Sequence, residues 1–149
     1  MNTDILVVNA NPLLNLVHVG EYAPGLVNRV PHLSMMAEGK GVNVARCLAR
    51  HGHSVVLTGF AGGHSGAWLR DLVSAEGISD VWVETAAPIR VGFMASSGKE
   101  GHPTTILPDG FPVTAAECRA LLARIEAFLG SVRLVIASGS VPDPVANDL

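Results

Sequence analysis

The chain has 149 residues, with ten lysines and arginines against thirteen aspartates and glutamates, so its formal net charge is −3 at pH 7. Hydrophobic residues make up 48% of it and charged residues only 15%, which excludes a disordered chain. The acidic balance speaks against a nucleic-acid partner, and no apolar run approaches the roughly 18 residues of a membrane span. We expect a cytoplasmic protein with no nucleic-acid or membrane partner, whose two cysteines, Cys47 and Cys118, are buried free thiols.

The first segment predicts a buried strand followed by a turn. Ile5–Val8 is a short apolar run that ends at residues 9–12, Asn-Ala-Asn-Pro. Asn9, Asn11 and Asn15 lie at and beyond the end of this strand, where parallel sheets bind ligands, although asparagine is also an ordinary turn residue. Residues 26–30 and 32–36 resemble two short extended pieces of a peripheral sheet, because Pro31 between them cannot donate a ladder hydrogen bond.

The middle of the chain alternates helices and strands. A helix begins within Gly39–Asn43 and ends at Gly52, a buried strand covers 54–60, and a second helix runs from about Ser65 to Glu76. Apolar strands that alternate with helices predict a parallel sheet covered by helices.

Residues 80–107 have a different character. Short strands are predicted at 81–83, 89–94 and 104–107, with a hairpin-like turn at 98–101. These strands fit the parallel sheet poorly, as do residues 26–36. We expect the two patches to pair with each other as a small antiparallel layer at one side.

The last segment predicts one more helix and one more strand. Thr114 begins the helix, and Glu117 three residues later completes the pattern of a capping box. The apolar residues 133–137 follow as a buried strand that ends in the turn 138–142. This strand would form an exposed apolar edge of the sheet.

The segment around Lys40 carries the most chemistry. Gly39 and Gly41 flank this lysine at a helix N-terminus, where free N–H groups and the helix dipole favour an anion. Lys40 adds a positive charge and Asn43 a neutral donor and acceptor, which suits a phosphorylated or polyhydroxylated ligand. The alternative is a plain turn with a surface lysine. It is not a P-loop, because Gly41 stands where a magnesium-binding hydroxyl is required.

Arg90 lies in a predicted strand rather than on a charged helix face. A guanidinium that projects into a cleft would bind phosphate well, and the alternative is a solvated arginine on an edge strand. We nominate no catalytic residue and no metal ligand, because the sequence shows no Ser/His/Asp arrangement and no histidine pair at helical metal-ligand spacing.

Several of these motifs together resemble the PfkB (ribokinase-like) carbohydrate kinases. Residues 38–45, Glu-Gly-Lys-Gly-Val-Asn-Val-Ala, followed by Gly52 and Gly62, are similar to the first signature of that family. The 1-phosphofructokinase and tagatose-6-phosphate kinase branch also has the Asn11-Pro12 turn, an arginine in a lid strand (here Arg90) and a turn like Gly139–Pro142. The resemblance extends over essentially all 149 residues.

The resemblance implies a ribokinase-like α/β fold, a doubly wound and mostly parallel sheet with a small β-sheet lid. Residues 1–149 would be the N-terminal part of one kinase domain, with lid segments at about 26–36 and 80–107. The second signature of the family, its catalytic base and its nucleotide pocket belong to a C-terminal half. We therefore expect a chain truncated before that half, with no aspartate that can be nominated as the base.

The resemblance also implies ATP-dependent phosphorylation of a sugar phosphate, similar to fructose 1-phosphate, with this chain supplying the substrate-binding half and the lid. The implied partners are the sugar phosphate, a second copy through the lid and the missing C-terminal half. ATP and Mg²⁺ would serve the complete domain, and we expect neither to bind this chain alone. The implied substrate-binding residues are Asn15, Gly39, Lys40, Gly41, Asn43 and Arg90.

Whether the chain is an enzyme stays open at this point. A catalytically inactive sugar-phosphate-binding or dimerisation module is the alternative, and an unrelated nucleotide-binding α/β domain is a third interpretation. Three departures from the family pattern bear on this choice: Glu38 replaces a small residue, Asn15 replaces an aspartate, and Gly92 stands in a lid pattern that is usually polar. A carboxylate at Glu38 would repel a phosphate unless it points away or pairs with Lys40.

Overall fold

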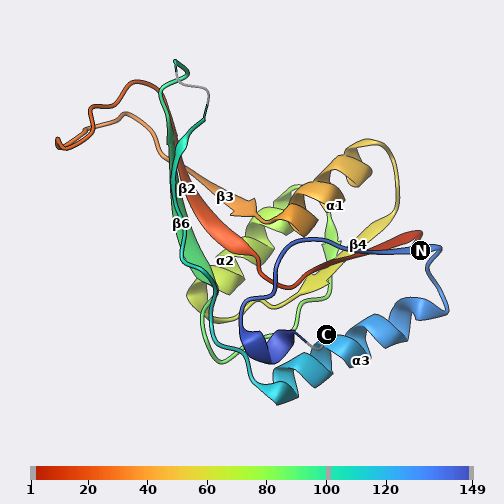
Figure 1. The fold of residues 1–149 in the computed structure, drawn as a ribbon. Helices are drawn as coiled ribbons and strands as arrows, with labels where there is room; N and C mark the ends of the chain where they lie inside the picture. The colour runs from red at the N-terminus through yellow and green to blue at the C-terminus, as the bar shows by residue number, and fades with distance from the viewer. Residues whose placement is uncertain (1–2, 100–101, 148–149) are drawn as a thin grey trace.

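The computed structural model describes residues 3–99 and 102–147 and arranges them around two four-stranded sheets (Figure 1). The strands of the first sheet are all parallel, in the order β5 (Ser79–Asp80), β4 (Val55–Gly59), β1 (Ile5–Asn9) and β8 (Leu134–Ala137). The second sheet, the lid sheet, has the order β3 (Ser34–Glu38), β2 (Leu13–Val19), β6 (Arg90–Ser96) and β7 (Thr104–Ile106). The predicted α/β fold with a parallel sheet and a small separate sheet is therefore confirmed.

Helices cover both faces of the parallel sheet. In Figure 1, α1 (Lys40–Arg50) and α2 (Gly63–Ala75) lie on one side of the sheet and α3 (Ala115–Leu129) on the other. Side chains alternate along a strand, so Ile5 and Val7 join the core with α1 and α2, whereas Leu6 and Val8 pack with Phe128 of α3. This two-sided burial explains why the strands are apolar runs rather than alternating ones.

The lid sheet corrects two predictions. Residues 26–30 form no strand, and the lid instead begins with β2, directly after the Asn11-Pro12 turn. β2 pairs antiparallel with β3 and parallel with β6, so the two patches 26–36 and 80–107 do not pair with each other. The sequence did not predict β2, because its polar residues Asn15 and His18 are buried. They break the alternation of apolar and polar residues that is expected of a half-exposed strand.

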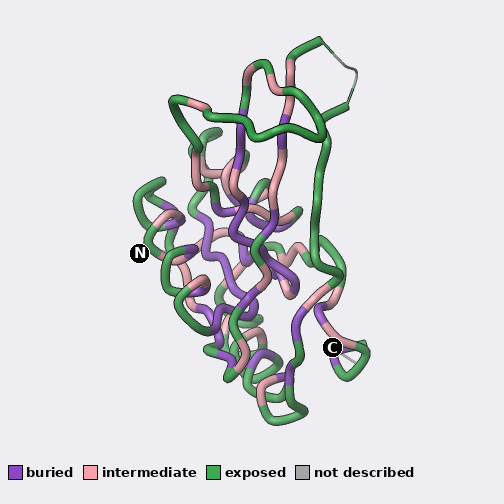
Figure 2. Tube along the Cα trace, turned by 90° about the vertical axis from the view of Figure 1, so that its left-hand side faces the viewer, coloured by how far each residue is buried: buried purple, intermediate pink, exposed green. Residues whose placement is uncertain are grey.

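The two sheets differ in burial. Figure 2 shows buried residues concentrated in the body around the parallel sheet, while the tip of the lid and the segment that connects β2 to β3 are mostly exposed. The predicted hairpin turn at 98–101 includes residues 100 and 101, which lie outside the described residues. Among the described residues, no helix is long and apolar enough to cross a membrane.

The two cysteines are in different environments. Cys118 is buried on the inner side of α3, and its burial raises the pKa of the thiol. Cys47 is exposed, contrary to the prediction, because the buried face of α1 is formed by Gly41, Val42 and Ala45. Cys47 is two positions beyond Ala45 and so lies on the opposite side of the helix.

The capping box of α3 forms as predicted. Thr114 Oγ1 accepts a hydrogen bond from the Glu117 N–H at 3.2 Å, and Glu117 Oε2 accepts one from the Thr114 N–H at 2.6 Å. Burial raises the pKa of Glu117, but its hydrogen bonds with Thr114 and with the Ala86 N–H outweigh that effect, so this pKa lies below its ordinary value. The predicted edge strand is also confirmed, because β8 ends the parallel sheet. The predicted burial of residues 133–137 is wrong: an edge strand is covered less than a central one, and none of these residues is buried, with Leu134 49% exposed.

We predict that Thr114→Ala lowers the free energy of unfolding by about 1 kcal/mol, because it removes the oxygen that caps α3. Urea denaturation followed by circular dichroism measures the change. Thr114→Ser keeps the hydroxyl and should retain most of the stability. Equal losses in the two variants would contradict a capping role.

Candidate functional site

The carboxyl end of β1 is the place where this topology forms a ligand crevice. From β1 the chain passes through the lid strands and α1 to β4 on one side, whereas β8 joins the other side of β1 after α3. Parallel sheets bind ligands at such a switch point, outside the carboxyl ends of the strands. Three segments meet here: the residues after β1, the N-terminus of α1, and the turn that follows β8.

Asn9, the last residue of β1, is 1% exposed and contacts the glycine turn that begins α1. Its Oδ1 accepts a hydrogen bond from the Gly41 N–H at 3.1 Å. A Cβ on Gly39 would lie 2.4 Å from Asn9 Nδ2, and one on Gly41 would lie 2.5 Å from Asn9 Cβ. Gly39 also has a φ of 140°, which favours glycine, so the turn needs both glycines to approach β1 this closely.

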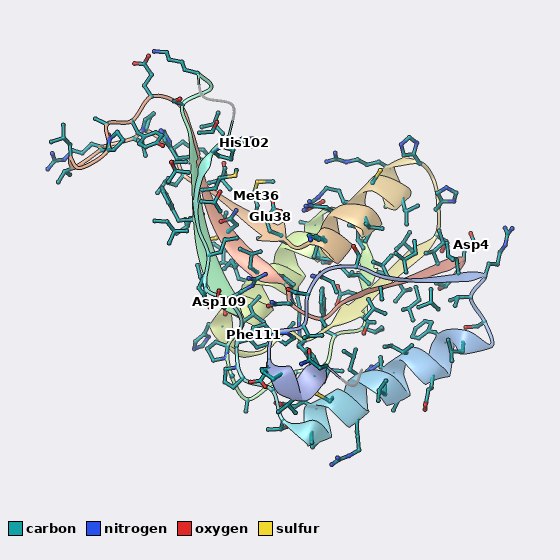
Figure 3. The ribbon with its side chains drawn as sticks, viewed as in Figure 1. Asp4, Met36, Glu38, His102, Asp109 and Phe111 are labelled. Carbon is teal, nitrogen blue, oxygen red and sulfur yellow. The ribbon has the colours of Figure 1, made fainter. Side chains whose placement is uncertain are left out.

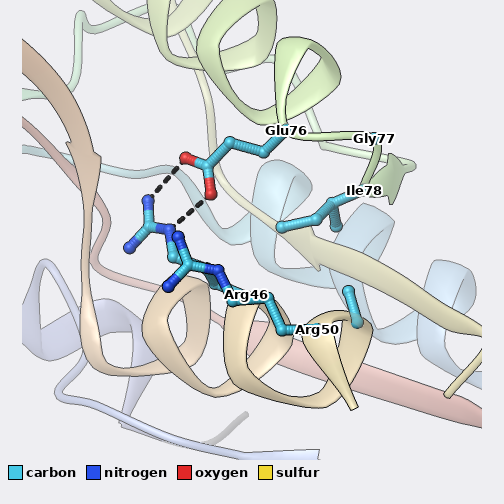
Figure 4. A pocket seen from close by; sticks show the side chains of 6 residues that line it. Arg46, Arg50, Glu76, Gly77 and Ile78 are labelled. Atoms are coloured by element: carbon cyan, nitrogen blue, oxygen red, sulfur yellow. Dashed lines mark hydrogen bonds and ion pairs between the residues drawn. The ribbon is translucent and has the colours of Figure 1, made fainter. Parts of the chain in front are cut away.

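Lys40 and Asn43 are both exposed, but their surroundings differ. The Asn43 side chain lies in a polar chain on the outside of α1, where its Nδ2 donates to Glu38 Oε2 at 3.3 Å and its Oδ1 accepts from Arg46. Arg46 forms an ion pair with Glu76 at the end of α2, which raises the pKa of the guanidinium (Figure 4). Glu38 therefore contacts Asn43 rather than Lys40, and the Asn43 amide is already occupied on both sides.

Asn15 lies in the lid sheet near its base, 6% exposed, and its Oδ1 is buried without a hydrogen-bond partner among the described residues. It pairs in register with Gly92 of β6. A Cβ on Gly92 would lie 3.1 Å from Asn15 Oδ1 and 2.5 Å from Leu107 Cδ2. A side chain at position 92 would therefore collide with Leu107 and crowd the Asn15 amide, so the lid strands pack closely at this glycine.

Arg90, the first residue of β6, is half-buried and joins the lid to the body. Its Nη1 donates to the carbonyls of Pro108 at 2.8 Å and Asp109 at 3.3 Å, and its Nη2 donates to the Asn11 carbonyl at 3.1 Å. Burial lowers the pKa of Arg90, and the charge of Asp109 opposes that shift. In Figure 3, Asp109 lies at the foot of the lid sheet, near the turn that follows β1.

Asn11 connects the same segments from the other side. Its Nδ2 donates to the carbonyl of Asp109 at 3.2 Å, to Ser140 Oγ at 3.0 Å and to the carbonyl of Val141 at 3.3 Å. The turn after β1, the segment after β7 and the turn after β8 are therefore held together by one side chain. Arg90 adds the base of β6 to this group.

Four buried polar atoms in this region have no partner among the described residues: Asn9 Nδ2, Asn11 Oδ1, Asn15 Oδ1 and Arg90 Nε. Native proteins leave few buried polar atoms unpaired, because each costs free energy. These four atoms, at the end of β1 and near the base of the lid, are free to bond with a polar ligand or with water.

The structure places the six predicted site residues unequally. Gly39, Gly41, Asn15 and Arg90 surround the carboxyl end of β1 and the base of the lid, Lys40 lies at the exposed rim, and Asn43 faces Glu38 and Arg46 instead. The prediction did not include Asn9, Asn11 and Ser140 among the site residues. The available signal for them was polar residues directly after buried strands.

The pattern of the pfkB family carbohydrate kinases matches residues 10–149. The chain belongs to this family. Over 145 residues it is 28% identical to the 1-phosphofructokinase of Bacillus subtilis (strain 168), covering 97% of this chain and 46% of that enzyme. The chain thus spans about half the length of the curated relatives it matches.

Solved structures of the family have the same fold. A structure from Thermotoga maritima, described as a possible 1-phosphofructokinase, superposes with a TM-score of 0.87 at 28% identity, over 93% of this chain and 45% of that one. The tetrameric inhibited form of phosphofructokinase-2 from Escherichia coli has a TM-score of 0.81 at 25% identity, over 94% and 46% of the two chains. The chain therefore has a ribokinase-like α/β fold and spans less than half the length of these family members.

The enzymes of the family use ATP and Mg²⁺ in general. Within residues 3–99 and 102–147, no group of three or more His, Cys, Asp or Glu side chains is placed to hold a metal ion. We assign the described residues no step that involves the metal.

We predict that Arg90→Met lowers the free energy of unfolding by about 2 kcal/mol, because three carbonyls at the base of the lid lose a charged donor. Arg90→Lys should recover only part of this, since one ammonium lacks the fork geometry of a guanidinium. The matched control is Arg29→Met, at an exposed arginine of the segment between β2 and β3, which should change stability little. Urea denaturation compares the three variants, and equal stability of Arg90→Met and Arg29→Met would contradict the role of Arg90.

Proposed function

We propose that this chain provides the sugar-phosphate-binding half and the lid of a kinase that transfers the γ-phosphoryl group of ATP to a sugar phosphate similar to fructose 1-phosphate. The observation that carries the proposal is the group of four unpartnered buried polar atoms between the end of β1 and the base of the lid, in a chain of the pfkB family. The similarity to 1-phosphofructokinases supports the substrate class.

The proposed roles follow from the charge and burial of each side chain. Asn15 Oδ1 accepts a hydrogen bond from a sugar hydroxyl, because it is a buried acceptor without a partner among the described residues. Lys40, at the exposed N-terminus of α1, neutralises part of the phosphate charge together with the helix dipole. Arg90 contributes positive charge from the base of the lid while its carbonyl contacts hold it in place. Phosphoryl transfer depends mainly on such positioning and neutralisation.

Glu38 works against this charge balance. Its carboxylate contacts Asn43 and lies on the same strand end that leads into the glycine turn, so it brings a negative charge to the rim of the site (Figure 3). Arg46, a cation whose charge interacts with Glu38, is already paired with Glu76. We therefore expect Glu38 to weaken the binding of a phosphorylated sugar. We expect the Asn43 side chain to bond with Glu38 and Arg46 at the rim rather than with the ligand.

The proposal predicts that fructose 1-phosphate raises the midpoint of thermal unfolding of the 149-residue chain, because a ligand that binds only the folded state stabilises it. Lys40→Met should weaken this binding by about tenfold, as loss of a charge-assisted contact to phosphate does. Lys99→Met is the matched control, since Lys99 is an exposed lysine paired with Glu21 at the far end of the lid. No shift with the unmodified chain, or equal shifts in both variants, would contradict the proposal.

A sugar-phosphate-binding module without catalysis is the second candidate. The departure that favours it is the buried amide of Asn15 in the lid sheet, which keeps the hydrogen-bonding capacity of the family's aspartate but not its negative charge. The two candidates separate when this chain is fused to the C-terminal half of the Bacillus subtilis 1-phosphofructokinase. A fusion that binds fructose 1-phosphate and phosphorylates it with ATP supports the kinase, whereas binding without turnover supports the module.

We also propose that the lid sheet pairs with the lid of a second copy. The lid carries apolar side chains at its surface: Ile106 (66% exposed) and Val91 (44%) lie on one face of the sheet and Val19 (76%) on the other, and exposed apolar side chains favour association. A related protein of the same fold is known as a tetramer.

We predict that the chain sediments as a dimer and that Ile106→Lys shifts it to the monomer, because a charge on the apolar lid opposes burial. Leu129→Lys, at the exposed end of α3, is the matched control and should stay dimeric. Sedimentation velocity over a range of concentrations measures both. A monomeric unmodified chain, or an unchanged dimer in Ile106→Lys, would rule out the lid as the interface.

A further inference from the structure

Asn9 is the residue around which the candidate site is built, although the sequence pattern alone leaves open whether it faces a ligand or only forms a turn. It ends β1 in the middle of the parallel sheet and is 1% exposed. Its Oδ1 accepts the Gly41 N–H at 3.1 Å, and this bond fixes which end of the amide is oxygen.

Four glycines, from three segments of the chain, lie close to this residue. A Cβ on Gly39 or Gly41 would come within 2.5 Å of the Asn9 side chain, and one on Gly59, at the end of β4, would lie 2.0 Å from the Asn9 carbonyl oxygen. A Cβ on Gly139, in the turn after β8, would lie 3.3 Å from Asn9 Oδ1. Three segments that border the carboxyl end of β1 therefore approach Asn9 at a glycine.

Only the oxygen of the Asn9 side-chain amide forms a hydrogen bond among the described residues. Its Nδ2 is buried and has no partner in the described part of the chain, although an unpaired buried donor costs free energy. A small apolar residue would avoid that cost but would lose the acceptor for the Gly41 N–H. The structure thus retains an unpaired donor in order to keep the acceptor, which indicates that the hydrogen bond to Gly41 matters for the shape of the turn.

We propose that Asn9 is a positioning residue: it holds the Gly39–Gly41 turn against the end of β1 and so sets where Lys40 and the first N–H groups of α1 face a bound sugar phosphate. Its part in binding rests on the function proposed above. Its part in the shape of the turn does not, because the contacts that carry it involve only this chain.

The first measurement needs no ligand. Hydrogen exchange followed by NMR reports the protection of the Gly41 amide in the unmodified chain and in three variants, Asn9→Ala, Asn9→Asp and Thr58→Val. Asn9→Ala removes the acceptor, so the Gly41 amide should exchange at least about tenfold faster. Asn9→Asp keeps an oxygen at the same place and should preserve the protection. Thr58 is equally buried on the neighbouring strand and bonds to the Val81 carbonyl, so Thr58→Val controls for a general loss of stability.

The second measurement is the affinity for fructose 1-phosphate by calorimetry. Asn9→Ala should bind about tenfold or more weakly, because a small displacement of binding groups has effects of that size, while Thr58→Val should bind as the unmodified chain does. Unchanged protection of Gly41 in Asn9→Ala, or lost protection in Asn9→Asp, would overturn the proposal. If Asn9→Ala fails to fold, the Asn9→Asp comparison still decides the point.

The outcomes separate this inference from the proposed function. Faster exchange in Asn9→Ala with unchanged affinity would show that Asn9 shapes the turn but does not position the ligand, which overturns the inference and leaves the proposed function standing. An unmodified chain that does not bind fructose 1-phosphate would overturn the proposed function and the binding role together, while the exchange data still decide the role of Asn9 in the turn.

Discussion

The hydrogen bond from the Gly41 N–H to Asn9 Oδ1 joins the last residue of β1 to the first turn of α1, and much of the structure depends on it. It brings a helix N-terminus, with its unpaired N–H groups, to the carboxyl end of the central strand. The approach is so close that glycine is required at 39 and 41, because a Cβ at either position would collide with Asn9. A simple turn after β1 would not require the N-terminus of α1 to approach the strand this closely.

A second set of contacts fixes the lid relative to this strand end. Arg90 and Asn11 together bond the carbonyls of Pro108, Asp109 and Val141 and the hydroxyl of Ser140. The base of the lid is thus attached to the body, while its tip is exposed and makes fewer contacts with the body (Figure 2). A sheet anchored at its base can cover a ligand without disturbing the residues that bind it.

The charges at the rim of the proposed sugar-phosphate site are of both signs. Lys40 and Arg90 are basic, but Glu38 brings a carboxylate next to the glycine turn, and Arg90 is partly engaged by carbonyls. Asn15 preserves hydrogen-bonding capacity at the base of the lid without adding charge. The proposed site would therefore depend more on hydrogen bonding and the α1 dipole than on a concentration of positive side chains.

The sequence alone was sufficient for the elements whose signals are local. The apolar runs of β1, β4 and β8, the glycine turn before α1 and the capping box of α3 all follow from neighbouring residues, and the family resemblance followed from ordered motifs. Only the tertiary structure decided that β2 lies in the middle of the lid sheet and that Cys47 is exposed. It also decided that the Asn43 side chain contacts Glu38 and that four glycines lie close to Asn9. These features depend on contacts between residues distant in the chain. A pattern of neighbours cannot show whether a polar side chain is buried by another segment or free in solvent.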